Sequence, residues 1–205
     1  MLTRYLPFIG AMALVVVSSN YLVQFPIKIA VGPLNLADLL TWGAFTYPMA
    51  FLVSDLTNRR FGVHGARIVV MSGFLLAVAL SIILATPRIA IASGAAFFVA
   101  QMLDVSIFDR LRSMKWWQTP LISSILASIV DTALFFSLAF SASFAVLGPM
   151  DEFAVAGSAL FGVLPIEAPR WVSWALGDLV VKFAIALAML LPYGILQGKM
   201  ARPVS

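Results

Sequence analysis

Long apolar stretches separated by short polar connections run through the whole chain. Most of these stretches come close to the ~20 residues that an α-helix needs to cross a lipid bilayer. The apolar runs are continuous rather than alternating, which favours helices over the strands of a membrane β-barrel. Pro26, Pro87 and Pro120 interrupt the pattern between stretches. We therefore predict an all-α polytopic membrane protein with six transmembrane helices, at about 5–24, 38–57, 64–86, 88–109, 119–145 and 171–196.

The basic residues gather in alternate connections, which predicts the direction of each helix because lysine and arginine mark the cytosolic side of a membrane. One side carries nine of them: Arg4, Arg59, Arg60, Arg67, Arg110, Arg112, Lys115, Lys199 and Arg202. The other side carries three: Lys28, Arg88 and Arg170. Both termini are therefore expected in the cytosol and the loop 146–170 outside. No small-residue cleavage site closes the first stretch, so we expect a membrane span there rather than a removed leader.

The composition leaves no room for a soluble domain. Of the 205 residues, 62% are hydrophobic and 11% are charged, against roughly 45–50% and about 25% in soluble domains. We predict a single integral membrane domain over residues 1–205, with no nucleic-acid partner, since topology explains the net charge of +4. The absence of cysteine excludes disulfides and thiol nucleophiles. With a single histidine, His64, neither a metal site nor a cofactor is predicted.

Three ionisable residues lie inside predicted spans. Asp131 is near the middle of the fifth, and Asp178 and Lys182 are one helical turn apart in the sixth. A charged side chain at this depth costs roughly 3 kcal/mol on insertion scales, so it is kept where it faces a protein interior or a water-filled cavity. Asp178 and Lys182 could simply neutralise each other. Asp131 has no basic residue on its own helix, so it needs a partner from elsewhere, a proton or a ligand.

Other polar residues extend this group towards the outer surface. Asn20 and Gln24 end the first span on the outer side, Tyr47 lies near the middle of the second, and Gln101 lies a little past the middle of the fourth. Aromatic residues share helical faces with them, as in binding sites with apolar walls and a few placed polar groups. The pattern predicts a cavity that is open outward, if these groups face one another. Pro48 is expected to kink the second span.

A second polar group lies near the predicted cytosolic ends of spans two and four. Its members are Asp55, Asn58, Arg59, Asp104, Asp109 and Arg110. Because the acids lie beside arginines, structural anchoring or gating through ion pairs is favoured there over contact with a substrate.

Several long segments resemble the queuosine precursor transporter family, the stand-alone membrane proteins of the vitamin-uptake type. The matching segments are SSNYLVQFP (18–26), LTWGAFTYPMAFLVSDLTNRRFG (40–62), RIAIASGAAFFVAQMLDVSIFDRLR (88–112), WWQTPLISSILASIVDTALFF (116–136) and LGDLVVKFAIAL (176–187). The resemblance implies uptake across the bacterial inner membrane of 7-cyano-7-deazaguanine and 7-aminomethyl-7-deazaguanine, the precursors of the tRNA base queuosine. It also implies a fold similar to the substrate-binding components of energy-coupling-factor importers, with the loop 25–37 as a lid.

Such a cargo suits the polar residues of the spans. A guanine-like edge offers adjacent N–H donors, which a carboxylate accepts in bidentate fashion, and a carbonyl acceptor. We expect Asp131 or Asp178 to take the donors and Gln101 or Lys182 to reach the carbonyl. The planar ring needs an aromatic face. The candidates for stacking are Trp42, Phe45 and Tyr47, and the residues expected at the entrance are Asn20 and Gln24.

Two other functions compete with a transporter. An enzyme is disfavoured, since neither a G-x-S-x-G nor a G-x-G-D segment is present. A passive substrate-capture subunit is the stronger rival, because the chain has no G-x-x-x-x-G-K-[ST] loop and cannot hydrolyse nucleotide itself. Coupling to protons through Asp131 or the Asp178–Lys182 pair is compatible with the sequence. So is a homodimer, because glycine and alanine patches in spans three to five allow close helix packing.

Overall fold

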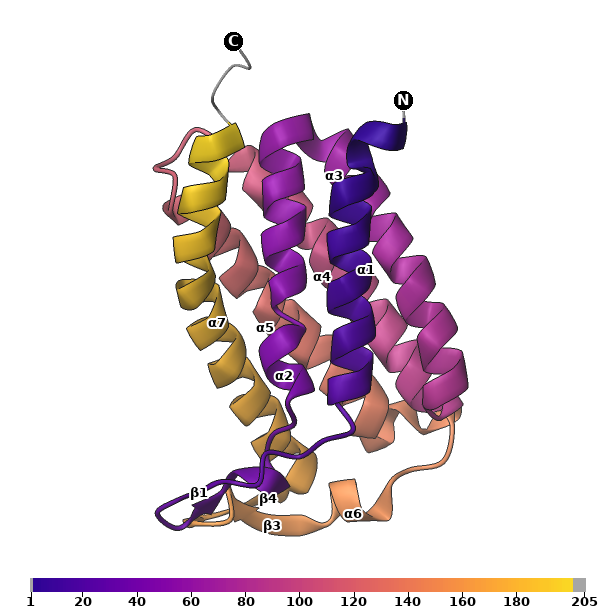
Figure 1. Ribbon diagram of the computed structural model, residues 1–205. Helices are drawn as coiled ribbons and strands as arrows, with labels where there is room; N and C mark the ends of the chain where they lie inside the picture. The colour runs from indigo at the N-terminus through magenta and orange to yellow at the C-terminus, as the bar shows by residue number, and fades with distance from the viewer. Residues whose placement is uncertain (1, 201–205) are drawn as a thin grey trace.

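The computed structural model describes residues 2–200 and shows a bundle of long helices capped at one end by two small β-hairpins (Figure 1). The helices are η1 (Leu2–Tyr5), α1 (Leu6–Leu22), η2 (Leu36–Asp38), α2 (Gly43–Thr46), α3 (Met49–Leu84), α4 (Pro87–Arg110), α5 (Gln118–Phe140), η3 (Ala142–Leu147), α6 (Glu152–Val155) and α7 (Arg170–Met200). The strands are β1 (Ala30–Val31), β2 (Leu34–Asn35), β3 (Gly157–Leu160) and β4 (Leu164–Pro169). Arg202, which entered the charge count, lies outside the described residues.

Within residues 2–200, five helical stretches are long and apolar enough to cross a membrane. They are Thr3–Leu22, Gly43–Leu84, Pro87–Arg110, Gln118–Phe140 and Arg170–Lys199. Their outer faces are apolar, with Ile83 78% and Leu191 72% exposed, as expected of surfaces that meet lipid rather than water. The protein is therefore an all-α multi-pass membrane protein, as predicted.

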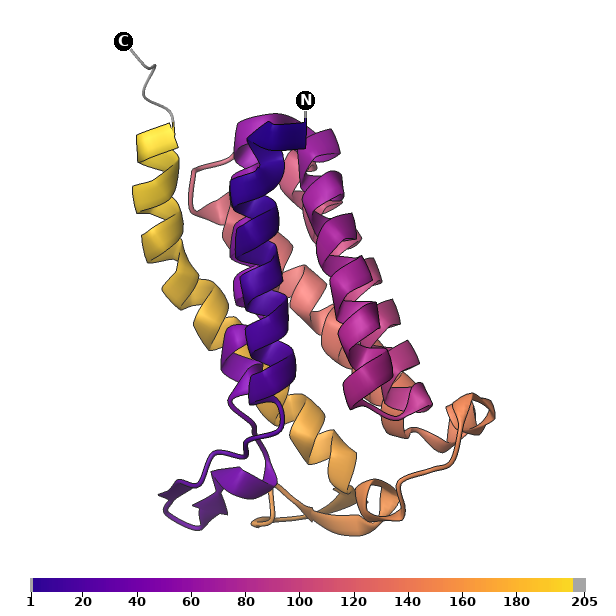
Figure 2. The same cartoon turned by 45° about the vertical axis from the view of Figure 1, so that its right-hand side comes forward.

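The second stretch contains 42 residues and reverses direction at Gly62. A straight helix of that length would span roughly 60 Å, about twice the hydrocarbon core of a bilayer. At Gly62 the backbone leaves the helical region, with φ 75° and ψ −177°. The Ser19 hydroxyl contacts that of Thr46 at 3.0 Å near one end of α1, whereas Gly65 lies against the ring of Tyr5 at the other end. The two halves of α3 therefore run in opposite directions along the bundle (Figures 1 and 2).

Two predicted boundaries are wrong. The second span was expected to begin at 38, but residues 39–42 are not helical because they pair with the segment that follows α1. The Ile27 amide donates to the Leu40 carbonyl at 3.1 Å, and the Trp42 amide donates to the Phe25 carbonyl at 3.0 Å. The fifth span was expected to reach 145, but α5 ends at Phe140. The extended backbone of Ser141 stops it there. The predicted break at Pro48 separates α2 from α3.

Small residues let the helices approach closely in the interior. A Cβ atom on Gly73 would lie 2.5 Å from Met12, so only glycine fits where α1 crosses α3. Met12, Val69, Val70 and Phe97 are at most 1% exposed and join α1, α3 and α4 in one apolar cluster.

Both hairpins lie at the end of the bundle opposite to η1 and the last turn of α7 (Figure 1). The hairpin β1–β2 falls in the loop predicted as a lid, and β3–β4 falls in the loop 146–170. Arg88, 3% exposed, ties the second of these loops down: its guanidinium donates to the backbone carbonyls of Leu138, Ser141, Gly148 and Pro149. The fold thus holds an ordered layer over one end of the helices.

Candidate functional site

A cavity of about 970 Å³ lies beneath the two hairpins and extends into the bundle. Its walls come from the ends of α1, α3 and α4, from α5 and α7, and from both hairpin loops. Small-molecule sites in proteins measure roughly 300–1,000 Å³, so the space suits a compact organic ligand. The cavity is where the sequence predicted it, although the contribution of β3–β4 was not anticipated.

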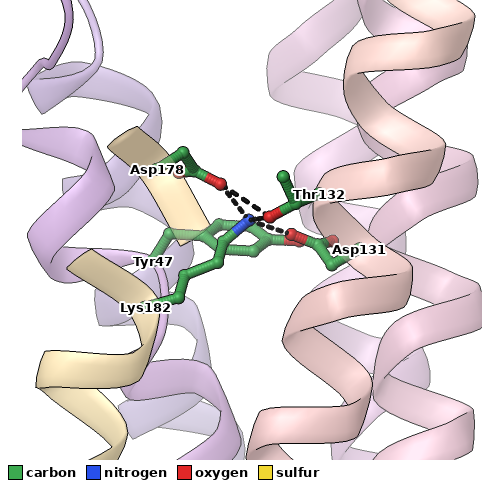
Figure 3. Close-up of polar contacts among 5 residues, drawn as sticks. All are labelled: Tyr47, Asp131, Thr132, Asp178 and Lys182. Carbon is green, nitrogen blue, oxygen red and sulfur yellow. Dashed lines mark hydrogen bonds and ion pairs between the residues drawn. The ribbon is translucent and has the colours of Figure 1, made fainter. Parts of the chain in front are cut away.

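The predicted intramembrane charges meet in this cavity (Figure 3). The Lys182 ammonium lies 2.6 Å from Asp131 Oδ2, 2.5 Å from Asp178 Oδ2 and 2.8 Å from Thr132 Oγ1. The Tyr47 hydroxyl donates to Asp131 Oδ1 at 3.1 Å, and the Thr132 hydroxyl donates to Asp178 Oδ2 at 2.8 Å. We call these five residues the Lys182 cluster. Its helices are α2–α3, α5 and α7, so the partner that Asp131 needed comes from a different helix.

The two carboxylates of the Lys182 cluster are not equivalent. Three oxygen atoms surround an ammonium group that has three N–H donors, so Lys182 is fully occupied. Both oxygens of Asp131 are also engaged, and its side chain is 4% exposed. Asp178 is 16% exposed, and within residues 2–200 its Oδ1 atom accepts no hydrogen bond. Asp178 therefore offers a free charged acceptor to the cavity, and Asp131 serves as a buried counter-ion.

Aromatic side chains form one wall above the Lys182 cluster. The Trp174 ring packs edge-on against Phe140 at 5.5 Å and stacks on Phe153 at 6.2 Å between centroids. The Trp174 indole N–H also donates to the Asp38 carbonyl at 2.8 Å, which joins α7 to the end of the predicted lid. The guanidinium of Arg170 lies 3.9 Å above the Phe153 ring. Phe140, Phe153 and Trp174 thus give the cavity an aromatic lining on this side.

Comparison of the sequence with known proteins identifies a family and named relatives. The profile of a family described as "Putative vitamin uptake transporter" matches residues 41–86 and 79–196. A protein of Escherichia coli K12 named "Queuosine precursor transporter" is 34% identical over 211 residues, and the alignment covers 92% of this chain and 84% of that protein. A "Probable queuosine precursor transporter" of Haemophilus influenzae is 32% identical over 216 residues, with the same coverage.

The chain belongs to the queuosine precursor transporter family. The resemblance inferred from sequence segments is thereby confirmed. No solved structure matches the chain.

In this member of the queuosine precursor transporter family, three residues that were predicted to contact the substrate do not line the cavity. Trp42 is 47% exposed and packs against Phe45 at 6.0 Å, and neither residue lines the cavity. The neighbouring residues Leu39, Leu40 and Thr41 do line the cavity, and the aromatic ring of Trp174 stands in its wall instead of Trp42. Gln101 is fully buried between helices and does not reach the cavity either. Asn20 and Gln24 do line the cavity.

The second polar group, predicted at the cytosolic ends of spans two and four, is only partly held by ion pairs. Asp109 pairs with Arg112 at 3.8 Å, but both side chains are more than one third exposed, and Arg110 is also at the surface. The stronger tie is reciprocal: Arg59 donates to the Arg112 carbonyl at 3.2 Å, and Arg112 donates to the Arg59 carbonyl at 2.6 Å. Asn58 adds a bond to the Val105 carbonyl at 2.9 Å. These contacts join the reversal at Gly62 to the end of α4.

Asp55 and Asp104 contradict the expected ion pairs. Both are buried, and neither takes part in a salt bridge among residues 2–200. Their carboxyls point into the bundle, where Ser54 donates to Asp104 at 2.9 Å. Sequence position near a helix end suggested contact with arginine, but the helical phase turns these acids away from the basic surface.

Proposed function

We propose that the chain is a membrane transporter that imports queuosine precursors, namely 7-cyano-7-deazaguanine and 7-aminomethyl-7-deazaguanine, into the cytoplasm. The observation that carries the proposal is the combination of relatives named for this cargo with a cavity that has a free carboxylate oxygen at its floor. A 7-deazaguanine is planar and presents adjacent N–H donors beside a carbonyl, which matches an acidic floor and an aromatic wall.

Asp178 is the proposed acceptor for the donor edge of the ligand. Its free Oδ1 atom can take one N–H without disturbing the Lys182 cluster. If the ligand displaces the Thr132 hydroxyl from Oδ2, a bidentate contact results, and such charge-assisted pairs are the strong ones. Lys182 could then turn a freed N–H to the ligand carbonyl. Trp174 and Phe140 would stack on the ring, and Asn20 and Gln24 would lie at the entrance.

We propose six membrane crossings, with each half of the Gly43–Leu84 stretch spanning once. The end of the bundle with η1 and the Gly62 reversal then faces the cytosol and carries the eight predicted cytosolic lysines and arginines that lie within residues 2–200, and the hairpins face outward. Both termini are proposed to be cytosolic. In a bacterium this places the chain in the inner membrane, with the cavity open to the outside. The segment 25–37 would act as the lid, since Pro33 and Asn35 line the cavity. We also propose that the fold is similar to that of the substrate-binding components of energy-coupling-factor importers.

The proposal assigns no catalytic step to the chain. A transporter of this kind runs on a gradient or on trapping of its cargo in the cell, whereas a passive capture subunit needs an external ATPase. The exposed apolar helix faces would also serve a homodimer within the membrane. Proton coupling through the Lys182 cluster would require one of its acids to release the lysine during transport.

Uptake of labelled 7-cyano-7-deazaguanine into liposomes that hold only this protein tests the function. Accumulation by the purified chain supports a self-sufficient transporter, and binding without uptake supports a capture subunit. A protein that shows no binding and no uptake contradicts the proposed cargo. Asp178→Asn should weaken binding about 10- to 100-fold, the equivalent of losing a charged hydrogen bond worth roughly 1.5–3 kcal/mol. Glu167→Gln, an exposed acid on β4 outside the cavity, is the matched control and should bind as wild type. Unchanged affinity in Asp178→Asn would remove Asp178 from the site.

A further inference from the structure

A second pair of acids lies in the half of the bundle opposite to the hairpins. Asp55 of α3 and Asp104 of α4 are 2% and 0% exposed, and their carboxyl groups are close enough to interact directly. Their polar neighbours are neutral hydroxyl groups: Ser54 on α3 and Ser123 and Ser124 on α5. The Lys182 cluster does not include either acid.

No cation compensates this pair within residues 2–200. Neither acid forms an ion pair. The guanidinium groups of Arg59 and Arg112 are instead bonded to each other's backbone carbonyls, and that of Arg59 lies over the Phe108 ring. Two carboxylates that share a buried site without a cation cannot both be ionised, as in other carboxyl pairs that hold one proton between them. The pair therefore needs a bound positive charge to exist in this packing.

An unsatisfied hydroxyl group points to the same place. Tyr193 is 1% exposed, its hydroxyl makes no hydrogen bond, and it lines a small cavity together with Asp55 and Ser124. That cavity, about 10 Å³, has room for one water molecule. Asp55 Oδ1 and Asp104 Oδ1 also lack partners. Buried polar atoms are seldom left unpaired, so this group has capacity for a proton and a water that carries it.

We propose that Asp55 and Asp104 form a proton-binding site, separate from the Lys182 cluster, whose occupancy controls the cytosolic side of the bundle. A proton bound to one carboxyl oxygen becomes an O–H that donates to the other carboxylate, leaves the pair with a single negative charge and lets α3 and α4 pack closely. When the proton leaves to cytosolic water, two adjacent carboxylates remain, which repel each other and must be hydrated, and α3, α4 and α7 separate at that end. The role in transport rests on the proposed function, but the binding of a proton does not.

Infrared spectroscopy of the substrate-free protein in lipid tests proton binding directly. At neutral pH the wild type should show the C=O band of a protonated carboxyl, because exposed acids are ionised there. The band should be lost in Asp55→Asn/Asp104→Asn and kept in Glu167→Gln. Asp104→Glu retains a carboxyl and should keep the band at a shifted position. This variant separates loss of the proton-binding carboxyl from a folding defect as the cause of a missing band. A wild type without the band, or a band that survives the double variant, overturns the proposal.

Transport measurements test the coupling. With labelled 7-cyano-7-deazaguanine, Asp104→Asn should lose accumulation driven by a pH gradient while it keeps exchange of labelled for unlabelled ligand across the liposome membrane. Accumulation that remains pH-driven in the variant, or that follows a sodium gradient in the wild type, overturns the coupling role. A wild type that neither binds nor exchanges the ligand refutes the proposed function instead, and the infrared result still decides the proton site.

Discussion

Replacing Lys182 by methionine should destabilise the folded protein strongly. Methionine keeps the length of the apolar stem but removes three donors from the oxygens of Asp131, Asp178 and Thr132. The formal charge of the Lys182 cluster falls from −1 to −2 in a region where Asp131 is 2% exposed. Removing one partner of a buried ion pair costs roughly 3–5 kcal/mol, because the remaining charge is left uncompensated. We expect a loss of that size in the free energy of unfolding.

A second substitution on the same background separates charge from packing. Lys182→Met/Asp131→Asn returns the formal charge to −1, and the new side-chain amide at position 131 can accept from Tyr47 and donate towards Asp178. The double variant should therefore recover more than half of the stability lost in Lys182→Met. Unfolding in mixed detergent and SDS micelles, followed by circular dichroism, measures both. Lys115→Met, an exposed lysine in the loop after α4, is the control and should change little.

Two results would refute this reasoning. If Lys182→Met costs less than about 1 kcal/mol, the range of a surface ion pair, then water reaches the cluster and the charges are not buried partners. If the double variant is no more stable than Lys182→Met, the lost stability comes from side-chain packing and not from uncompensated charge.

Three further predictions concern the scaffold around the cavity. Gly62→Ala should lower the free energy of unfolding by about 1–3 kcal/mol, because φ 75° with ψ −177° suits only glycine. The control is Gly10→Ala within helix α1, and a loss of stability in Gly62→Ala no larger than in this control would contradict the prediction. Arg88→Met should lower the free energy of unfolding by at least about 3 kcal/mol, because it removes the bonds to the carbonyls of Leu138, Ser141, Gly148 and Pro149, and Arg88→Lys should be intermediate. Equal stability of the Met variant and wild type would show that those bonds are replaced by water. Trp174→Phe should speed amide exchange in residues 30–38 about 2- to 10-fold by releasing the Asp38 carbonyl, and exchange at the wild-type rate would mean that this segment is held by other contacts.

The helices were predictable because apolar length and proline punctuation are local signals. The starts of α4 and α7 fall within one residue of the prediction. The errors lie where distant segments decide the conformation. Residues 39–42 are apolar enough for a helix, but they pair with 25–27, which no window of the sequence reveals. The hairpin β3–β4 likewise depends on its position above α7, and its short strands carry no strong alternation.

The candidate site shows the same division between local and long-range signals. Depth and helical phase predicted that Asp131, Asp178 and Lys182 face the interior of the bundle. They did not predict that Lys182 lies between both acids, since this depends on the crossing of α5 and α7. Thr132 was missed altogether, although it follows Asp131 directly in the sequence and a hydroxyl beside a buried acid is a usable hint.

The two acidic sites differ in one respect that sets what each can bind. The Lys182 cluster holds its own cation between its two carboxylates, so in the proposed site a neutral ligand edge adds to the free oxygen of Asp178. Asp55 and Asp104 have no such cation among residues 2–200, so their charge must be set by whatever positive charge they bind. Under the two proposals, a lysine fixed in the protein makes one acid pair a receptor for hydrogen-bond donors, and the absence of such a lysine leaves the other pair responsive to protons. The same side-chain chemistry, placed at two depths of one bundle, would then serve cargo at the outer end and its driving ion at the inner end.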